Sequence, residues 1–273
     1  MPEVLTVDQI PMVCISLPRR SDRWAAFKTY ADAARIDVKK LPAVDAKSFD
    51  AATHPGISLG TAHNIRFKTR RSHYEIDAAG AIGCSLSHFK AWEQLRESSA
   101  PAMIIFEDDA PVPADFKPRL TQVLRELPAG WDLVQFQLTV WDHGVTGCKP
   151  IAGQEPWQLC DALMGSYAYM ISQEGARKML ERAYPIEIHM DAYMAYMSKL
   201  GHIRMIWHPL IDIPGPEADS DIAHGRQGVL AVPTNMRAAG IVALDEKAVW
   251  GLVGMAAVAG GLVALATFAA RRG

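Results

Sequence analysis

Short apolar runs that alternate with amphipathic stretches are the feature of this sequence that most restricts its fold. Apolar runs between turn-forming residues are typical of buried strands, whereas apolar residues at three- and four-residue steps indicate helices that face a core. The pattern predicts strands at residues 12–17, 41–45, 102–106, 131–138, 165–172 and 203–207, and helices at residues 21–34, 83–96, 116–127, 173–183 and 190–200. This alternation predicts an α/β fold with a mixed central sheet. Residues 46–79 and 139–164 lack a clear period and are expected to be irregular or a small excursion.

Three acidic residues, Glu107, Asp108 and Asp109, directly follow the apolar run at residues 102–106. Ligands of open α/β sheets bind beyond the carboxyl ends of the strands, which is where these acids are expected. Adjacent carboxylates repel one another unless a cation neutralises them, and oxygen ligands suit hard cations such as Mn²⁺ or Mg²⁺. The alternative is a solvated acidic turn. The apolar lead-in and the abrupt Pro-Val-Pro exit at residues 111–113 favour a site.

The longest apolar segment comes near the C-terminus, where residues 248–270 include no charged side chain. About 20 apolar residues in a helix cross a hydrocarbon core of about 30 Å. Trp250 lies near one end, as aromatic residues at a membrane interface do. A buried core helix is the alternative, but small residues on every side would make a poor core face. We expect a globular domain at residues 1–222, a linker at residues 223–247 and one transmembrane helix at residues 248–270, with the membrane as a partner.

The two ends of the chain bear on its expected location. The N-terminus has no basic leader followed by an apolar region, so a signal peptide is not expected. Residues 1–222 are therefore expected in the cytoplasm, tethered to a membrane by a single-pass helix. Arg271 and Arg272 favour the opposite orientation, because positive residues tend to stay on the cytoplasmic side.

The cysteines and the charge exclude some classes of protein. The formal net charge is −2, which argues against a nucleic-acid partner because such proteins usually present a basic face. The four cysteines lie far apart and include no CxxC pair; they are Cys14, Cys84, Cys148 and Cys160. This spacing favours reduced, partly buried thiols over a disulfide framework or a zinc site.

Six segments carry more specific signals. In chain order they are residues 13–23 (VCISLPRRSDR), 83–92 (GCSLSHFKAW), 104–110 (IIFEDDA), 168–180 (AYMISQEGARKML), 185–194 (PIEIHMDAYM) and 220–222 (SDI). In this order they resemble glycosyltransferase family 25, the family of lipopolysaccharide and collagen galactosyltransferases. Ser16 stands where that family commonly has Asn, and the Gln expected before the last segment is missing.

The resemblance implies a GT-A-like nucleotide-sugar-binding domain whose metal is held by an acidic motif. Carried onto this chain, it makes Asp109 and Glu107 the metal ligands, and it gives Glu107 or Asp108 a role in binding the donor's ribose or a metal-bound water. The metal would be Mn²⁺ or Mg²⁺.

Arginines after the first predicted strand are the expected partners of the donor's diphosphate. Arg19, Arg20 and Arg23 follow that strand, and a guanidinium can pair with phosphate oxygens or stack on a base. For Arg23, an ion pair with Asp22 or with another acid is the alternative.

His88 and Asp191 are the residues for which the resemblance implies catalytic roles. His88 lies inside a predicted helix, where a packed, hydrogen-bonded histidine is the alternative. An inverting transfer needs a general base, and Asp191 matches the family's acid after the proline segment. Its alternative is an ordinary N-cap for the helix that follows. Glu187 is the reserve candidate.

The function that the resemblance implies is transfer of a hexose, expected to be galactose from UDP-galactose, to a glycan or lipid-linked acceptor. A catalytically inactive, membrane-tethered binding module that kept the fold is the rival hypothesis. Ser16 and the missing Gln favour the rival, whereas the intact Glu107-Asp108-Asp109 triplet favours the enzyme.

Overall fold

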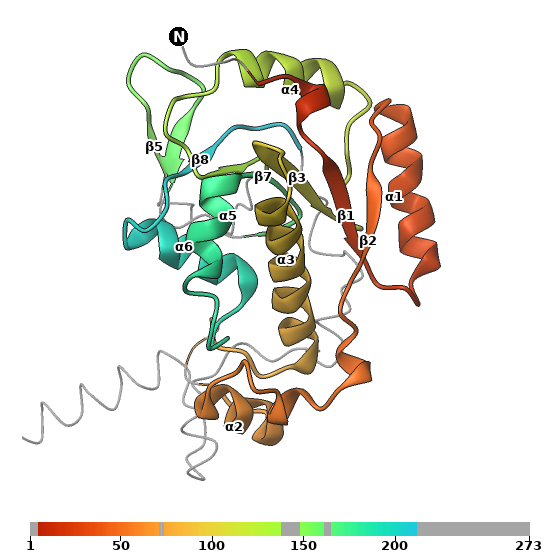
Figure 1. Ribbon diagram of the computed structural model, residues 1–273, viewed down its shortest axis with the longest axis vertical. Helices are drawn as coiled ribbons and strands as arrows, with labels where there is room; N and C mark the ends of the chain where they lie inside the picture. Colours follow the sequence, from red (N-terminus) through yellow and green to blue (C-terminus); the bar gives the residue numbers. More distant parts are fainter. Residues whose placement is uncertain (1–4, 71, 73, 138–147, 161–164, 212–273) are drawn as a thin grey trace, which may run out of the picture.

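The computed structural model describes residues 5–70, 72, 74–137, 148–160 and 165–211 of the 273-residue chain (Figure 1). Its helices are α1 (Ser21–Ala33), α2 (Leu59–Phe67), α3 (Ala79–Glu97), α4 (Phe116–Arg125), α5 (Gln173–Leu180) and α6 (Met190–Lys199). Its strands are β1 (Met12–Ser16), β2 (Lys39–Pro42), β3 (Ala102–Glu107), β4 (Leu133–Gln135), β5 (Cys148–Pro150), β6 (Gln158–Cys160), β7 (Ala168–Ser172) and β8 (Met205–Trp207). They form one mixed sheet in the order β2-β1-β3-β7-β4-β8-β6-β5, which confirms the predicted α/β class.

The sheet lies between two layers of helices, with α3, α5 and α6 on one face and α1 and α4 on the other (Figure 1). Successive side chains of a strand point to opposite faces of the sheet, so a buried strand contributes side chains to the hydrophobic core on each face. Val13 and Met103 pack with the first helix group, whereas Cys14 and Ile104 pack with the second. Because β1 and β3 are buried on both faces, their sequences are almost wholly apolar.

The pairing of β1 with its neighbours sets the position of the acidic triplet. The strand β1 runs parallel to both β2 and β3, and Ile15 lies opposite Glu107 in the register. Parallel strands end at the same edge of a sheet. The segment that follows β1 therefore meets the segment that follows β3, although about 90 residues separate them in the chain.

Two stretches expected to be irregular contain regular elements. Helix α2 lies inside residues 46–79, and the hairpin of β5 and β6 lies inside residues 139–164. Helix α2 buries only Thr61 and Ile65, so its apolar period is too weak to stand out in the sequence. It begins at a side-chain cap, because the Ser58 hydroxyl accepts a hydrogen bond from the Thr61 N–H at 3.1 Å.

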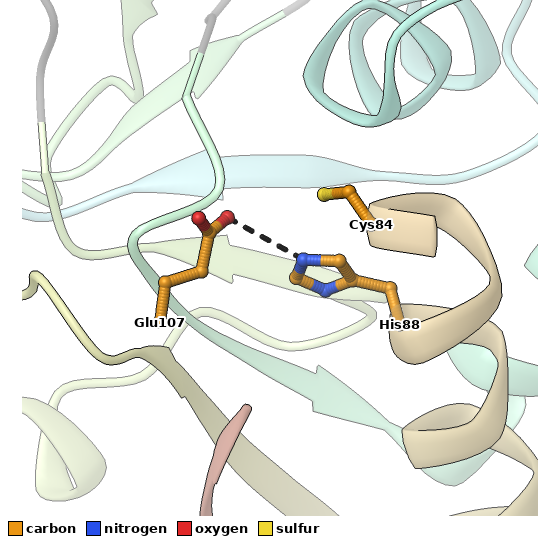
Figure 2. A group of neighbouring side chains, drawn as sticks. All are labelled: Cys84, His88 and Glu107. Atoms are coloured by element: carbon orange, nitrogen blue, oxygen red, sulfur yellow. Dashed lines mark ion pairs between the residues drawn. The ribbon is translucent and has the colours of Figure 1, made fainter. Parts of the chain in front are cut away.

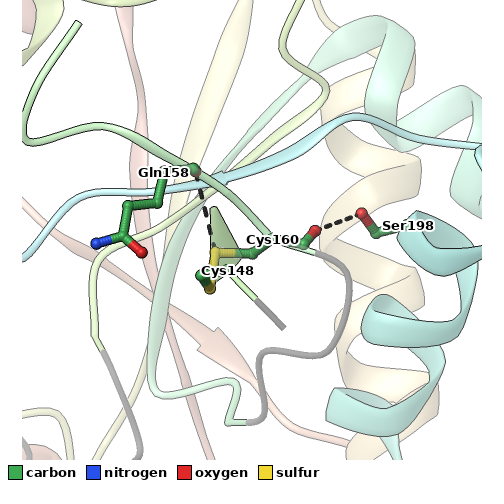
Figure 3. Close-up of a disulfide and its surroundings, with 4 residues drawn as sticks. All are labelled: Cys148, Gln158, Cys160 and Ser198. Atoms are coloured by element: carbon green, nitrogen blue, oxygen red, sulfur yellow. Dashed lines mark hydrogen bonds between the residues drawn. A yellow bond between two sulfur atoms is a disulfide. The ribbon is translucent and has the colours of Figure 1, made fainter. Parts of the chain in front are cut away.

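The expectation that all four cysteines are reduced is wrong for one pair. Cys148 and Cys160 form a disulfide, while Cys14 and Cys84 are free thiols (Figure 3). The two bonded residues lie opposite each other on β5 and β6, so the hairpin register brings them together. Sequence spacing alone does not reveal that register. The Ser198 hydroxyl on α6 donates a hydrogen bond to the Cys160 carbonyl oxygen at 2.6 Å and ties the hairpin to the helix layer.

No helix in the described part of the chain is both long enough and apolar enough to cross a bilayer. The predicted linker at residues 223–247, the predicted transmembrane helix at residues 248–270 and the motif at residues 220–222 all lie outside the described residues.

Candidate nucleotide-sugar site

A cleft of about 250 Å³ opens at the carboxyl edge of β1 and β3. Its walls are the ends of these two strands, the segment after β2 and the first half of α3. The side chains that matter for its chemistry are Arg19, Arg23, Asp45, Cys84, Ser87, His88, Glu107, Asp108 and Asp109. The tertiary structure thus gathers most of the residues that the sequence nominated separately.

Helix α3 can form this wall because it approaches the segment after β2 very closely. A Cβ atom on Gly83 would lie 2.5 Å from the Val44 carbonyl oxygen, so only glycine fits there. The Ser87 hydroxyl accepts a hydrogen bond from the Val44 N–H at 2.8 Å and donates one to the Gly83 carbonyl oxygen at 2.6 Å. Ser87 therefore fastens the helix to the loop.

Arg23 neutralises two of the three acids. Its Nε atom lies 2.7 Å from Asp108 Oδ1, and its Nη2 atom lies 2.6 Å from Asp109 Oδ2. The structure thus shows the alternative for Arg23, an ion pair with an acid other than Asp22. Burial raises the pKa of Asp109 to about 7, and the negative charge of Glu107 adds to this shift against the opposing effect of Arg23. Asp109 Oδ1 is buried without a hydrogen-bond partner.

Glu107 faces a buried histidine. Its Oε1 atom accepts a hydrogen bond from the Ser166 hydroxyl and lies 3.4 Å from His88 Nε2. Figure 2 shows Glu107 at the end of β3 and His88 on α3 pointing toward each other, with Cys84 one helical turn away from His88. His88 is thus both a packed core residue and a neighbour of the acidic triplet, so the two alternatives for it are not exclusive.

A hydrogen-bonded chain holds His88 from behind. His88 Nδ1 lies 2.8 Å from the Tyr169 hydroxyl oxygen, and the Trp92 indole N–H donates to the same oxygen at 2.9 Å. All three side chains are fully buried. The sequence did not place Trp92 and Tyr169 behind His88, because aromatic residues in these positions are more often simple packing.

Asp191 does not line the cleft. It lies in the first turn of α6, whose N-cap is His189, so the alternative that Asp191 is an N-cap is wrong. Its carboxylate accepts hydrogen bonds from the Gly165 N–H at 3.2 Å and from the Ala192 N–H at 2.7 Å. Burial raises the pKa of Asp191, and the charge of Glu107 acts in the same direction.

The remaining candidates separate into two groups. Arg19 lines the cleft and bonds Asp45, with 2.8 Å between Nε and Oδ2. Arg20 is not among the cleft-lining residues and contacts Asp22 at 2.9 Å. The reserve candidate Glu187 lines a different groove, beside α6.

The sequence could have revealed two residues that it did not. Cys84 lies four positions before His88, a spacing that places both on one face of a helix. Asp45 follows β2, at the edge where the acids collect. Ser166 carries no such signal, because only the antiparallel pairing of β7 with β3 brings it to Glu107.

Known proteins resemble this chain over the same segments. The family model described as glycosyltransferase family 25 (LPS biosynthesis protein) matches residues 9–194. A glycosyltransferase 25 family member from Aedes aegypti is 30% identical over 67% of this chain and 30% of its own length. A procollagen galactosyltransferase 1-B from Xenopus laevis is 27% identical over 66% of this chain and 29% of its own length.

Another relative carries a different description. A probable inactive glycosyltransferase 25 family member 3 from Bos taurus is 29% identical over 61% of this chain and 28% of its own length. This chain thus spans less than a third of the length of these relatives. Among solved structures, apo UDP-glucose pyrophosphorylase is 8% identical and covers 74% of this chain and 91% of its own, with a TM-score of 0.39, too low to assign a ligand. The family model alone spans most of the described domain, and the chain belongs to glycosyltransferase family 25.

Proposed function

We propose that this chain is a metal-dependent glycosyltransferase that moves a hexose from a nucleotide-sugar donor to a glycan or glycolipid acceptor. One observation carries the proposal: three acids and Arg23 line a cleft at the carboxyl edge of β1 and β3. Ligands of α/β sheets collect at such an edge, and a GT-A-like domain would hold its nucleotide there. Family membership supports the reaction class.

A divalent metal fits the side chains of this cleft. Arg23 pairs with one oxygen of Asp109, but the other oxygen is buried without a partner, and burial raises the pKa of the carboxyl, so a cation would stabilise its ionised form. We propose Asp109 and Glu107 as ligands of Mn²⁺ or Mg²⁺, with Asp108 binding the ribose or a metal-bound water. When bound, such a metal neutralises charge that develops on a diphosphate leaving group.

The donor is proposed to be UDP-galactose. Arg19 and Arg23 both line the cleft, where a guanidinium can hold phosphate oxygens through paired hydrogen bonds. Arg20 would act at the outer side of the same turn. Galactose is the proposed sugar because one relative is named a procollagen galactosyltransferase; the name belongs to that protein, and a donor screen must decide for this one.

Two residues have proposed roles in the chemistry. In an inverting transfer, Asp191 would take the proton of the acceptor hydroxyl, and its raised pKa makes it a stronger base than an ordinary aspartate. Because Asp191 lies outside the donor cleft, the acceptor would have to enter from the side of α6. His88 would hold Glu107 in position beneath the donor.

A membrane location is also part of the proposal. Residues 248–270 would hold the catalytic domain, residues 1–222, at a membrane surface, close to a lipid-linked acceptor. Deletion of residues 248–270 should move the protein from the membrane fraction to the supernatant. A deletion variant that stays with the membrane would contradict the tether.

The activity is tested by UDP release from UDP-galactose by the purified full-length chain, with and without Mn²⁺. We expect turnover only with the metal, and a loss of at least about a hundredfold in Asp109→Asn, because several kcal/mol of charge stabilisation disappear. The matched control is Asp115→Asn at an exposed acid before α4, which should keep full activity. Equal loss in both variants, or turnover that ignores Mn²⁺, would sink the metal-dependent assignment.

A catalytically inactive binding module is the second candidate, because one relative is named probably inactive. A module of this kind would still gain thermal stability from nucleotide and Mn²⁺ together. It would release no UDP with any acceptor tried, which separates it from the enzyme.

A further inference from the structure

A cysteine, a histidine and a glutamate meet beside the donor cleft (Figure 2). Cys84 and His88 lie four residues apart on one face of α3, and Glu107 ends β3 opposite them. Their ligand atoms, one from each side chain, all lie within 4.8 Å of one another. Thiolate sulfur, imidazole nitrogen and carboxylate oxygen are the three kinds of side-chain ligand that bind Zn²⁺ in proteins.

His88 presents one ring nitrogen to this cluster. Its side chain has no solvent exposure, and its Nε2 atom has no hydrogen-bond partner. Its other nitrogen, Nδ1, lies 2.8 Å from the Tyr169 hydroxyl oxygen. Histidines that bind metals usually anchor the second ring nitrogen on an oxygen in this way, which fixes the orientation of the ring. The Nε2 atom, which makes no hydrogen bond, therefore faces the cluster, with Glu107 Oε1 at 3.4 Å.

The spacing between His88 and Glu107 suits a shared cation. His88 Nε2 and Glu107 Oε1 are 3.4 Å apart, at the long limit for a hydrogen bond. Two nitrogen or oxygen ligands at about 2.0 Å from one tetrahedral ion lie about 3.3 Å from each other. The Cys84 sulfur lies within 4.8 Å of both of these ligand atoms, and Cys84 and His88 border the cleft through which an ion can enter.

The chemistry of the cluster selects the kind of ion. Sulfur and imidazole ligands favour Zn²⁺ over the hard cations Mg²⁺ and Mn²⁺. Burial raises the pKa of the Cys84 thiol, and the negative charges of Glu107, Asp191 and Asp109 act in the same direction; the same charges attract a cation. Asp109, the central residue of the proposed Mn²⁺ site, contributes no ligand atom to this group.

We propose that Cys84, His88 and Glu107 form a binding site for one thiophilic divalent cation of the Zn²⁺ class, which shares Glu107 with the Mn²⁺ or Mg²⁺ site proposed at Asp109. Binding displaces the thiol proton of Cys84, so affinity rises with pH. Because Glu107 belongs to both sites, Zn²⁺ held here inhibits transfer by withdrawing Glu107 from the donor's metal. The binding is independent of the proposed function, and the inhibition rests on it.

Cobalt titration of the full-length chain tests the site, because Co²⁺ adopts the zinc geometry and a thiolate ligand gives it a near-ultraviolet charge-transfer band. The titration is done without reductant, so that Cys148 and Cys160 stay paired. We expect a band that saturates at one equivalent of Co²⁺ and disappears when Zn²⁺ is added. Cys84→Ala should lose the band, and the matched variant Cys14→Ala, at the other free thiol, should keep it. No band in the parent chain, or a band that survives in Cys84→Ala, overturns the proposal.

Two further variants separate this site from the transferase site. Glu107→Gln keeps the thiol and should weaken Co²⁺ binding by about tenfold or more, with circular dichroism to verify that it is folded. Asp109→Asn should keep the cobalt band while it loses Mn²⁺-dependent UDP release. If Asp109→Asn loses the band as well, Asp109 is required to hold the thiolate-bound Co²⁺ and the proposed ligand set fails, whatever the outcome for the transferase.

Discussion

Burial and ion pairing shift the pKa of the Asp109 carboxyl in opposite directions. Burial and the charge of Glu107 disfavour its ionised form, whereas the guanidinium of Arg23 at 2.6 Å favours it. The balance leaves its pKa at about 7, above the ordinary value of 3.8. Near neutral pH the metal-free protein therefore holds an acid that is only partly ionised, and a cation that bound there would complete the ionisation.

This balance predicts how stability depends on pH. A carboxyl whose pKa is raised by folding stabilises the folded state fully below its unfolded pKa, and this contribution is lost as pH rises through the folded pKa. Relative to Asp109→Asn, the metal-free parent chain should therefore lose thermal stability between about pH 4 and about pH 7. Melting temperatures of the two proteins, measured in a chelator across this range, provide the check.

Asp45, whose pKa is lowered instead of raised, is the control for this pH-dependence. Hydrogen bonding to the Lys47 N–H, together with Arg19, lowers the pKa of Asp45, so its stabilisation is present above the ordinary pKa and is lost as pH falls below it. Asp45→Asn should therefore change the stability of the protein equally throughout the range from pH 5 to pH 7. A pH-independent difference between the parent chain and Asp109→Asn would contradict the raised pKa.

At the level of elements, α3 organises the site. This helix approaches the segment after β2 closely at Gly83 and is fastened to it by the Ser87 hydroxyl. It also carries Cys84 and His88, the two candidate soft-metal ligands, and the Trp92 indole that donates to Tyr169. Residues at three- and four-residue steps lie on the same side of a helix, so one side of α3 packs in the core and another lines the cleft. A substitution that tilts α3 should therefore change the shape of the cleft more than the packing of the sheet.

Gly83→Ala tests this role of the helix. The new Cβ would meet the Val44 carbonyl oxygen at 2.5 Å, so either α3 or the loop must move. We expect a loss of about 1–3 kcal/mol in the free energy of unfolding, as for other overpacked positions, together with weaker nucleotide binding. Urea denaturation and thermal shift with UDP and Mn²⁺ measure the two effects.

Gly60→Ala in α2 is the matched control. The nearest atom to its new Cβ would be the Ser58 hydroxyl at 3.6 Å, an ordinary contact. Alanine also favours helices over glycine by about 0.5–1 kcal/mol, so Gly60→Ala should be neutral or stabilising. If both variants behave alike, the close approach of α3 is not what positions the loop.

Over the whole molecule, the sheet separates the site from the disulfide. The strands β1 and β3 carry the cleft near one end of the strand order, while β6 and β5 close the other end. Strand β6 of the hairpin pairs with β8, and the Ser198 hydroxyl donates a hydrogen bond to the Cys160 carbonyl oxygen. Stability and donor binding should therefore respond differently to changes at the hairpin.

Removal of the disulfide tests this separation. In Cys148→Ser with Cys160→Ser, the unfolded chain regains the freedom of a loop with a sequence separation of 12, which is worth about 2–3 kcal/mol. We expect that loss in urea denaturation, with nucleotide binding at the cleft unchanged within about twofold because no residue of the hairpin touches it. A large fall in nucleotide affinity of the folded variant would show that the two ends of the sheet are coupled.

The sequence by itself determined the elements whose signals are local. The apolar runs of β1 and β3 are buried on both faces, and the three-residue steps in α3 place one side of that helix in the core. The acidic triplet at a strand end was likewise visible, since the order of residues along one strand already says which of them come last. The family resemblance lay in the same short segments.

The tertiary structure alone decided which of these residues meet. The parallel pairing of β1 with β3 brings Arg23 to Asp108 and Asp109, and the antiparallel pairing of β3 with β7 places Tyr169 behind His88, 81 positions away in the chain. The hairpin register joins Cys148 to Cys160 in the same way. The physical reason is that periodicity reports only on neighbours along the backbone, whereas contacts between distant side chains depend on strand order and register.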